Sequence, residues 1–365
     1  TVLVSVTYCI LRLKLRYNSV VLRMLGFMMV VFFSLRWTIN NNATNIAYTV
    51  IKYVIGAVLL YQIIESERDI QNFFNSLLFS SIFVLINTMA SVGGIGGLFL
   101  VMNQGFRIGN EIGGINGVGQ VLSLGFCLAC FRFFYREKYR LFFLVLTVAF
   151  FVTAISTGSK RALFIMVIFL FAIAFFKNRK NFFRLVLIIF ALIGLFMLIM
   201  HLPFMNFLSN RLDEFVSVLQ GSNTREDATD AVRMQLILHS IRMFFESPIL
   251  GYGVDSAKLL NLREFGRAYS MHNVYADIIA NFGLLGIITF ISIGFSNFLD
   301  LIRQARNCDD MLSDSLILLI SLCISVILMT NIASVSYQNS ILIYSLYIVI
   351  SRANEIILQK GGLQI

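Results

Sequence analysis

Long runs of apolar residues, separated by short polar segments, extend along most of the chain. A helix needs about 20 mostly apolar residues to cross a hydrocarbon core of roughly 30 Å. Eleven segments reach or approach that length, and we expect a transmembrane helix in each: 1–11, 20–39, 43–64, 71–92, 112–131, 141–157, 161–176, 183–201, 272–298, 314–332 and 337–357. None shows the strict alternation of a membrane β-strand, so the pattern predicts an all-α polytopic membrane protein.

One polar region, residues 202–271, interrupts this pattern. Within it, Thr224–Phe245 is predicted to be a helix, because Thr224 and Asp227 form a capping box and apolar residues recur at helical spacing. The expected apolar face consists of Val232, Leu236, Ile237, Ile241, Phe244 and Phe245. Pro248 ends the helix, and a glycine-containing turn follows. The simplest interpretation is a helix lying on the membrane surface, although a long loop with this much order is often functional.

The composition agrees with a membrane protein. Hydrophobic residues make up 58% of the chain and charged residues 13%, whereas soluble domains contain roughly 45–50% and about 25%. We therefore expect a single transmembrane helical domain over residues 1–365, with residues 202–271 as a large loop within it. The first apolar segment is short and begins at Thr1 rather than Met, so we expect a longer natural chain with a twelfth helix.

Lysine and arginine are distributed unequally between alternate loops. One set of loops, together with the C-terminal end, carries 17 basic residues, whereas the short loops of the other set carry four. Short cytoplasmic loops retain positive charge, so the first set is predicted to be cytoplasmic and residues 202–271 extracytoplasmic. This bias and attraction to anionic lipid headgroups explain the net charge of +10. No nucleic-acid partner is expected.

The four basic residues of the outer short loops are candidates for binding an anionic substrate: Arg36, Arg107, Lys160 and Arg161. Lys160 and Arg161 interrupt an apolar stretch, and a charge costs about 2.5–3.5 kcal/mol at the membrane centre and less near its interface. A plain turn between two spans explains them equally well. Arg233 lies on the expected polar side of the loop helix. If the loop packs onto the outer surface, Arg161 and Arg233 would suit a diphosphate, because guanidinium groups bind phosphate oxygens in pairs.

His272 begins the sequence His272-Asn273-Val274-Tyr275, where the large loop re-enters the membrane. Histidine is the side chain whose ordinary pKa suits proton transfer near neutral pH. A histidine in a loop is more often a bystander, so both interpretations stay open. As a catalytic group, His272 would act on a hydroxyl, with Asn273 and Tyr275 as candidates for binding the substrate.

The glycine-rich segment Gly93–Gly119 has a structural interpretation. It lacks the Gly-Lys-Ser/Thr ending of a phosphate-binding loop. Gly109, Gly113 and Gly117 are spaced four residues apart at the start of a span. This spacing favours close helix packing or a broken helix over a ligand site.

Three motifs follow one another in order along the chain. The first, Ser159-Lys160-Arg161-Ala162-Leu163, is similar to the Ser-Arg-Gly-Ala-Leu segment of bacterial O-antigen polymerases and ligases. Arg233, an apolar helix and Ser247-Pro248-Ile249-Leu250-Gly251-Tyr252-Gly253 resemble their Arg-helix-Pro-x-x-Gly-x-Gly block. His272-Asn273-Val274-Tyr275 with Asn281-Phe282-Gly283-Leu284-Leu285-Gly286 resembles their His-Asn…Gly-x-x-Gly signature. The usual Arg-Gly is replaced by Lys160-Arg161 before Ala162, which leaves the arginine role open between the two basic residues. We favour Arg161, because it precedes the small residue.

The resemblance implies a GT-C-like glycosyltransferase in the bacterial plasma (inner) membrane, with a periplasmic or extracellular active face. Its donor would be an oligosaccharide on undecaprenyl diphosphate. Arginines would hold the diphosphate, His272 would orient or deprotonate the acceptor hydroxyl, and neither a metal nor a cofactor would be needed. We expect a polymerase that joins lipid-linked repeat units into O-antigen or capsular-type polysaccharide, with membrane lipids, chain-length regulator and flippase proteins as partners. The alternatives are a ligase that transfers the finished glycan to another acceptor and, from another class, a lipid-linked glycan flippase or transporter.

Overall fold

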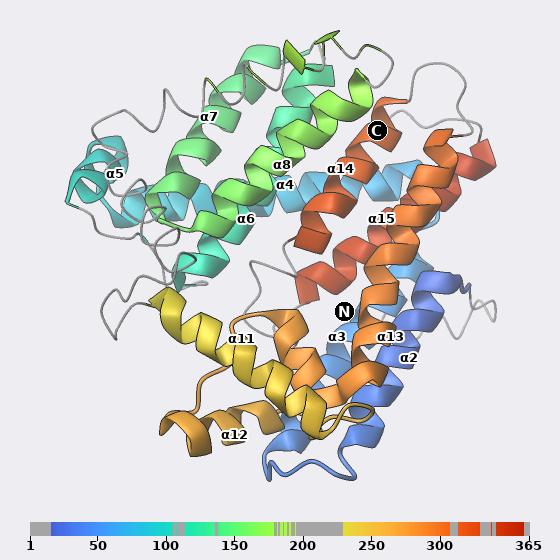
Figure 1. Cartoon of the computed structure of the whole chain (residues 1–365). Coiled ribbons are helices and arrows are strands. Elements are labelled where there is room, and N and C mark those ends of the chain that lie inside the picture. Colours follow the sequence, from blue (N-terminus) through green and yellow to red (C-terminus); the bar gives the residue numbers. More distant parts are fainter. Residues whose placement is uncertain are drawn as a thin grey trace. The chain divides into compact units, whose positions relative to one another are not determined.

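The computed structural model describes residues 16–104, 108, 114–135, 138–178, isolated positions between 181 and 194, 229–306, 313–328, 337 and 341–360. Among these residues, all the long secondary-structure elements are α-helices (Figure 1). Their bounds are α2 Ser19–Ser34, α3 Ala43–Ile63, α4 Glu67–Ser91, α5 Gly94–Asn103, α6 Gly114–Tyr135, α7 Arg140–Ser156, α8 Lys160–Lys177, α11 Thr229–Glu246, α12 Ser256–Phe265, α13 Val274–Arg306, α14 Asp314–Leu328 and α15 Ile341–Lys360.

Several of these helices match the expected membrane spans. Within the described residues, five are long and apolar enough to cross a membrane, namely α3, α4, α6, α13 and α15. The shorter helices α2, α7 and α14 are also apolar. The prediction of an all-α polytopic membrane protein is therefore confirmed. The number of eleven spans stays a prediction, because segment 1–11 and most of segment 183–201 lie outside the described residues.

The chain divides into two compact units. Unit 1 comprises Thr1–Asp69, Glu226–Asn307 and Val326–Leu363, and it contains α2, α3, α11, α12, α13 and α15. Unit 2 comprises Ile70–Arg225, Cys308–Ser325 and Gln364–Ile365, and it contains α5 to α8 with most of α4 and α14.

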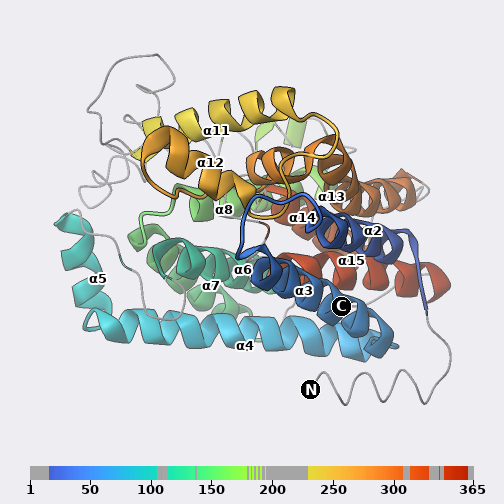
Figure 2. The ribbon, with the colours of Figure 1, turned by 90° about the horizontal axis from the view of Figure 1, so that it is seen from below.

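Unit 1 is built around an aromatic core. α13 packs along α2, α15 packs along α3, and α2 also contacts α3 (Figures 1 and 2). The buried rings of Phe27 (α2), Phe282 (α13) and Tyr337 meet edge to face, with centroids 5.1 to 6.4 Å apart. Edge-to-face pairs of this kind add to the stabilisation from burial alone. The core therefore holds α13 against α2 next to Phe282.

A buried polar network joins the ends of three helices in unit 1. Arg352 of α15 is 6% exposed, and it donates to the carbonyl of Ile64 at 2.9 Å and to Glu355 at 2.8 Å. The same carboxylate accepts hydrogen bonds from the Tyr61 hydroxyl at 2.7 Å and from the Asn18 amide at 2.5 Å. Because a buried charge is costly unless it is paired and hydrogen-bonded, these partners stabilise Arg352 and fasten α2, α3 and α15 together.

In unit 2, α6 packs against α7 and α8. Two glycines of α6 allow this approach. A Cβ on Gly125 would lie 2.6 Å from the Phe150 ring, and one on Gly119 would lie 3.0 Å from the Cβ of Ser159. A Cβ built on Gly117 would meet no atom of the described residues within 4 Å, so the described part of the chain shows no close packing at this glycine. A small residue brings helices together only where it faces the partner. Gly109 and Gly113 lie outside the described residues.

The large loop contains two described helices where one was expected. α11 confirms the predicted helix from Thr229 onward, whereas Thr224 and Asp227 of the expected capping box lie outside the described residues. α12, which is 10 residues long, was not predicted. It follows Asp255, whose left-handed backbone (φ 56°) is an uncommon start for a helix and carries no recognisable sequence signal.

The residues of the expected apolar face of α11 differ in burial. Leu236 is buried, whereas Ile241 is 43% exposed and Phe245 is 75% exposed. Met243, which was not assigned to that face, is buried as well. α11 packs on α13, and which face of α11 does so depends on tertiary packing rather than on helical spacing.

Candidate functional site

A turn of the large loop docks into an interruption of α13. Gly283 has φ 58° and ψ −149°, which separates two helical segments. Four backbone hydrogen bonds cross the gap, from Tyr252 N to Ala280 O (3.1 Å), Gly253 N to Asn281 O (2.7 Å), Leu284 N to Pro248 O (2.8 Å) and Leu285 N to Ile249 O (3.2 Å). The turn thus supplies partners for backbone groups that a helix break leaves unsatisfied. We call Pro248–Gly253 and the break at Gly283 the α13 joint.

Glycine is required on both sides of the α13 joint. Gly251 and Gly253 have φ values of 63° and 88°, in the left-handed region that side chains disfavour. A Cβ on Gly251 would lie 2.5 Å from the backbone of Asn281, and one on Gly283 would lie 2.7 Å from the carbonyl oxygen of Pro248. The sequence presents the Pro248–Gly253 turn and the motif around Gly283 as separate motifs. In the structure they are the two sides of one contact.

His272 lies two residues before the first residue of α13 and is partly buried. Its φ of 53° is left-handed, a conformation that costs roughly 1–2 kcal/mol for a residue with a Cβ. Asn273 caps the helix, since its side-chain oxygen accepts hydrogen bonds from the N–H groups of Tyr275 at 2.9 Å and Ala276 at 3.1 Å. Strained residues persist where the surrounding structure holds them, and they cluster at functional sites.

A hydrophobic cluster joins α11, α12 and the start of α13, and its buried members are Leu236, Met243, Ala257, Met271, Ala276 and Ala280. Val232 and Leu236, on either side of Arg233 in α11, belong to this cluster, and so does Met271, which precedes His272. The segments that carry Arg233 and His272 therefore pack on the same cluster (Figure 1). Arg233 is partly buried and its Nε is enclosed.

The loop between α2 and α3, which carries the exposed Arg36, binds the segment that leads into α12. The Thr38 hydroxyl donates to the carbonyl of Val254 at 2.8 Å. The Asn40 amide donates to the carboxylate of Asp255 at 2.8 Å. This loop is therefore fixed directly beside the α13 joint.

Sequence reasoning missed two buried polar residues of α13. Asp277 and Asn281 are 4% and 0% exposed. The Asn281 amide donates to Asp277 Oδ1 at 2.8 Å, and its oxygen accepts the N–H of Ala257 at 2.9 Å. Their spacing of four residues, which puts two side chains on one helix face, was the available signal. Together they connect the start of α13 to α12.

Tyr252 fastens the α13 joint to the end of α11. Its hydroxyl donates to Glu246 at 2.6 Å, and this hydrogen bond, more than burial, raises the pKa of Tyr252 to about 12. The phenol therefore stays protonated and keeps donating throughout the physiological pH range.

In unit 2, the turn before α8 presents Lys160 and Arg161 at a helix start. Thr157 and Ser159 are buried, and Gly158 between them has φ 64°. The Thr157 hydroxyl oxygen accepts the N–H of Ser159 at 3.2 Å, which tightens the turn. Arg161 is partly buried in the first turn of the helix. The N-terminus of a helix has partial positive charge, so both the backbone and the side chain favour an anion there.

An exposed apolar row runs along α11. It consists of Met234, Leu238, Ile241 and Phe245, with exposed fractions from 39% to 75%. In the α13 joint it continues to the exposed Ile249, whose carbonyl accepts the N–H of Leu285 in α13. An amphipathic helix of this kind suits the boundary between a membrane and water.

The structure describes most of the predicted site residues. His272, Asn273, Tyr275, Arg233 and Arg36 belong to unit 1, whereas Lys160 and Arg161 belong to unit 2. Each unit is described by itself, so the expectation that Arg161 faces Arg233 and His272 stays a prediction. Arg107 lies outside the described residues.

Comparison with known proteins identifies a family for part of the chain. Residues 142–291 match the O-antigen ligase family. This stretch runs from α7 into α13 and includes Lys160, Arg161, Arg233 and His272. The resemblance carried by the three motifs is therefore confirmed over these residues. A search of curated proteins found no significant match to the chain.

Proposed function

We propose, from the match of residues 142–291 to the O-antigen ligase family, that this protein joins lipid-linked oligosaccharide repeat units into a polysaccharide on the outer face of the bacterial plasma membrane. The observation that carries the proposal is the strained His272, held at the start of α13 on the same hydrophobic cluster as the Arg233 segment. Transfer of a glycan from a diphosphate donor to a hydroxyl acceptor requires a cation next to the diphosphate and a base next to the hydroxyl. A partly buried guanidinium and a fixed imidazole are suited to these two roles.

The donor in this proposal is an oligosaccharide on undecaprenyl diphosphate. Arg161 and Arg233 bind its diphosphate, with Lys160, Arg36 and Arg107 as further cations. Negative charge develops on the phosphate oxygen as the bond to the sugar breaks, and fixed cations stabilise that charge without reorganisation. Neither a metal nor a cofactor takes part.

The acceptor is a sugar hydroxyl of a second lipid-linked repeat unit. His272 accepts the hydroxyl proton while the acceptor oxygen forms a bond to the anomeric carbon of the donor. The bond from that carbon to the diphosphate breaks, and undecaprenyl diphosphate leaves with the bonding electron pair. Asn273 and Tyr275 bind the sugars next to this centre.

A membrane-borne substrate agrees with the exposed apolar row of α11. In the proposed orientation, residues 202–271 lie outside and the row touches the outer leaflet. A lipid-linked donor would then meet Arg233 at the level of its diphosphate. Chain-length regulator and flippase proteins are the expected partners.

A ligase is the second candidate, because the matched family is described by that activity. A ligase carries out the same bond exchange but transfers the finished glycan to a different acceptor. The two candidates therefore share the donor site and differ in the molecule that supplies the hydroxyl.

The site assignment predicts the effect of three substitutions. Arg161→Ala, Arg233→Ala and His272→Ala should each shorten or abolish the polysaccharide, with His272→Ala reducing the rate by roughly 10²–10⁴-fold as expected for a lost general base. The measurement is glycan length in cells that depend on the variant, at matched amounts of membrane-inserted protein.

Arg242, on the same loop helix, is a matched control. Its side chain is exposed and forms a surface ion pair with Glu264 at 3.1 Å, so Arg242→Ala should keep the wild-type glycan length. Wild-type activity in all three site variants would contradict the assignment.

Reconstitution distinguishes the candidate functions. Purified protein in liposomes, supplied only with a lipid-diphosphate-linked repeat unit, should produce a ladder of lengths. Reaction only after addition of a second acceptor would identify a ligase. Transport of the lipid-linked unit without bond formation would identify a flippase or transporter and contradict an enzyme.

A further inference from the structure

Lys52 is a charged residue near the middle of α3, one of the helices long enough to cross a membrane. It lies about 13 Å along the helix from Ala43, the first residue of α3. The apolar part that follows, Tyr53–Ile63, covers only about 16 Å, which is roughly half of a hydrocarbon core. α3 therefore crosses the membrane only if Lys52 lies at membrane depth. Ionisable side chains at that depth are rare and mark functional positions.

Lys52 is exposed, and its Nζ lies near two aromatic rings. The Nζ atom is 5.8 Å from the ring centroid of Tyr48 and 5.3 Å from that of Tyr53, which are cation–π distances. Among the described residues, no carboxylate forms an ion pair with Lys52. A cation that is not paired with a carboxylate at membrane depth favours an anionic ligand.

The exposed face of α3 changes in character along the helix. The charge pattern predicts that α3 begins on the outer side of the membrane. Its outer half exposes Thr44, Asn45 and Tyr48, and Tyr48 is 66% exposed. Its inner half exposes Ile55 (41%) and Ile63 (40%). Because a face that touches only acyl chains needs no polar side chains, the outer half indicates a ligand with polar groups.

Open space lies next to Lys52 on the same face. Gly56 follows Lys52 by one helical turn, and a Cβ built on Gly56 would meet no atom of the described residues within 4 Å. From the outer end inward, the face therefore presents polar groups, an ammonium group, an uncovered glycine and then hydrocarbon. A ligand that matches this order has a polar head, a negative charge below the head and a long apolar tail.

The outer end of α3 is fixed to the part of unit 1 that carries His272. The Asn40 amide, in the loop before α3, donates to the carboxylate of Asp255 at the start of α12. Ala257 of α12 belongs to the same hydrophobic cluster as Met271, the residue before His272. A polar head bound at the outer end of α3 is therefore held on the same unit as the proposed general base.

We propose that the exposed face of α3 binds the acceptor substrate as a polyprenyl diphosphate lipid. The ammonium group of Lys52 and the hydroxyl of Tyr48 contact the diphosphate, Asn45 contacts the first sugar, and the apolar inner half contacts the prenyl chain. This inference rests on the proposed function, in which two lipid-linked molecules are bound at once. The arginines bind the diphosphate of the donor, whereas Lys52 binds that of the acceptor, which keeps its diphosphate throughout the reaction.

The test captures a radiolabelled lipid diphosphate on α3. The photo-crosslinker p-benzoylphenylalanine replaces Ile55 in the full-length protein, which is reconstituted in phosphatidylcholine liposomes with labelled undecaprenyl diphosphate and irradiated. The label should attach to the protein, and excess unlabelled undecaprenyl diphosphate should suppress its attachment. Lys52→Gln should lower the capture about ten-fold or more, as expected when a charge-assisted hydrogen bond is lost. Lys52→Arg keeps a cation and should keep the capture.

A crosslinker at Ile288 is the matched control. Ile288 is an exposed apolar residue of α13, so it reports lipid that merely surrounds unit 1, and its capture should not change with Lys52→Gln. Equal capture at Ile55 by wild-type Lys52 and by Lys52→Gln would overturn the proposal. Suppression by phosphatidylglycerol as strong as by undecaprenyl diphosphate would do the same, because it would show a site for any anionic lipid. Crosslinking of Ile55 to another polypeptide would show a partner helix on this face and would also overturn the proposal.

Capture requires no bond formation, so its result is separate from that of the reconstituted reaction. Capture that depends on Lys52, without a ladder of products, would support the lipid diphosphate site and contradict the polymerase. A ladder of products without such capture would support the polymerase and overturn the site on α3.

Discussion

Within its motif, His272 has the one side chain suited to proton transfer near neutral pH. Its backbone has a left-handed φ, which a residue with a Cβ rarely adopts. The sequence indicated the first property through residue type. The left-handed φ follows from the way Met271 is buried on one side and Asn273 caps α13 on the other. The residue type is thus visible in the sequence, whereas the backbone conformation of His272 depends on how its neighbours are packed and capped.

The strain at His272 predicts an order of stabilities. His272→Gly removes the Cβ that disfavours a positive φ, whereas His272→Ala keeps it, so the glycine variant should be more stable by about 1 kcal/mol. Heating in detergent, followed by the fraction that remains monodisperse, measures this difference. Both variants should lack activity. An alanine variant as stable as the glycine variant would show that this backbone carries no strain.

His239, in the middle of α11, is the second histidine with a defined environment. Both ring nitrogens are enclosed and have no hydrogen-bond partner within the described residues, and the ring lies 5.4 Å from that of Phe265. Burial lowers the pKa of His239 below its ordinary value of 6.5; Arg242 lowers it further, while Glu264 and Glu246 oppose the shift. The folded protein therefore holds this side chain neutral.

This lowered pKa predicts a pH dependence of stability. Below about pH 6.5 the unfolded chain binds a proton at His239 more readily than the folded one, so stability should fall as the pH drops through that value. His239→Phe should lose less stability than wild type between pH 7.5 and pH 5.5 in a thermal-unfolding series. Parallel losses in the two proteins would rule out His239 as the source.

At the scale of elements, the α13 joint explains why the sequence has one glycine motif near the end of the large loop and a second one inside the helix that follows. Pro248–Gly253 and Gly283 are about thirty residues apart in the chain, yet they exchange backbone hydrogen bonds. Either motif alone predicts only a turn or a helix break. Their contact fixes the end of the loop against the helix that follows His272.

The α13 joint predicts a severe effect for Gly283→Ala. The new Cβ would lie 2.7 Å from the carbonyl oxygen of Pro248, in a backbone conformation (φ 58°, ψ −149°) that only glycine adopts readily. Backbone strain alone should cost about 1–3 kcal/mol, measured as loss of thermal stability in detergent.

Gly56→Ala is the matched control for Gly283→Ala. Gly56 lies inside α3, and a Cβ built on it would meet no atom of the described residues within 4 Å, so alanine should stabilise the helix by roughly 0.5–1 kcal/mol. Equal tolerance at both positions would contradict the close packing of the α13 joint.

The face of α11 shows what element-level prediction misses. The helix was predicted from apolar spacing, and its described part was found in place. Leu236 and Met243 pack inward, while Leu238 and Phe245 remain exposed. Both rows have helical spacing, so spacing alone could not select the buried one. The choice depends on where α12 and α13 lie.

At the scale of the whole molecule, the charge pattern predicts which side of the membrane each loop occupies. Asn41, between α2 and α3, and Lys138, before α7, are both exposed. In intact cells or sealed spheroplasts, an impermeant thiol reagent should label Asn41→Cys and should label Lys138→Cys only after lysis. The wild-type protein serves as the control for labelling of native cysteines. Of these, Cys127, Cys130 and Cys323 are buried. The reverse labelling would invert the topology and contradict an extracytoplasmic reaction.

The basic residues counted for that topology do not all have the same role. Arg23 donates to the carbonyl of Ser292 at 3.1 Å, and Arg352 is buried against Glu355. Both help to join helices of unit 1. A charge rule counts them correctly but cannot distinguish a loop cation from a structural one, because burial depends on neighbours distant in sequence.

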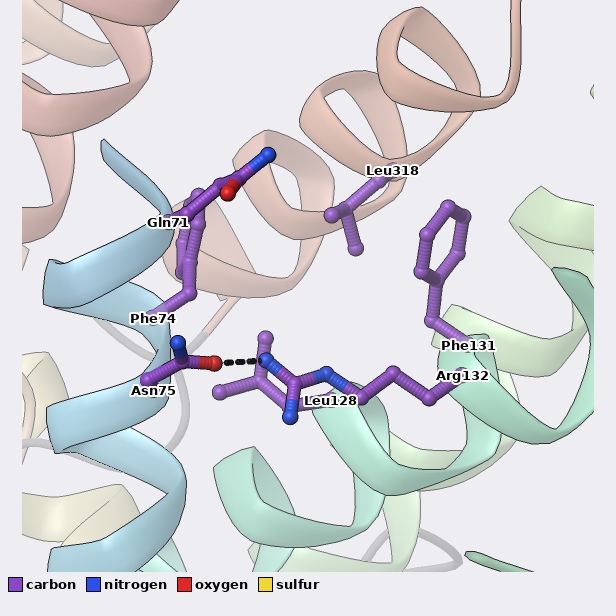
Figure 3. Close-up of a pocket in the computed structure, with 7 residues that line it drawn as sticks. All are labelled: Gln71, Phe74, Asn75, Leu128, Phe131, Arg132 and Leu318. Atoms are coloured by element: carbon purple, nitrogen blue, oxygen red, sulfur yellow. Dashed lines mark hydrogen bonds between the residues drawn. The ribbon is translucent and has the colours of Figure 1, made fainter. Parts of the chain in front are cut away.

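The sequence by itself determined the membrane class, most helix positions and the resemblance of residues 142–291 to the O-antigen ligase family, because apolar length, charge bias and local motifs are properties of short segments. Only the tertiary structure decided the strained backbone of His272, the partly buried position of Arg233 and the α13 joint between two distant glycine motifs. It also revealed a pocket around Arg132, which assembles residues from α4, α6 and α14 (Figure 3). Each of these features requires segments far apart in the chain to meet, and local pattern does not specify which faces they present to one another.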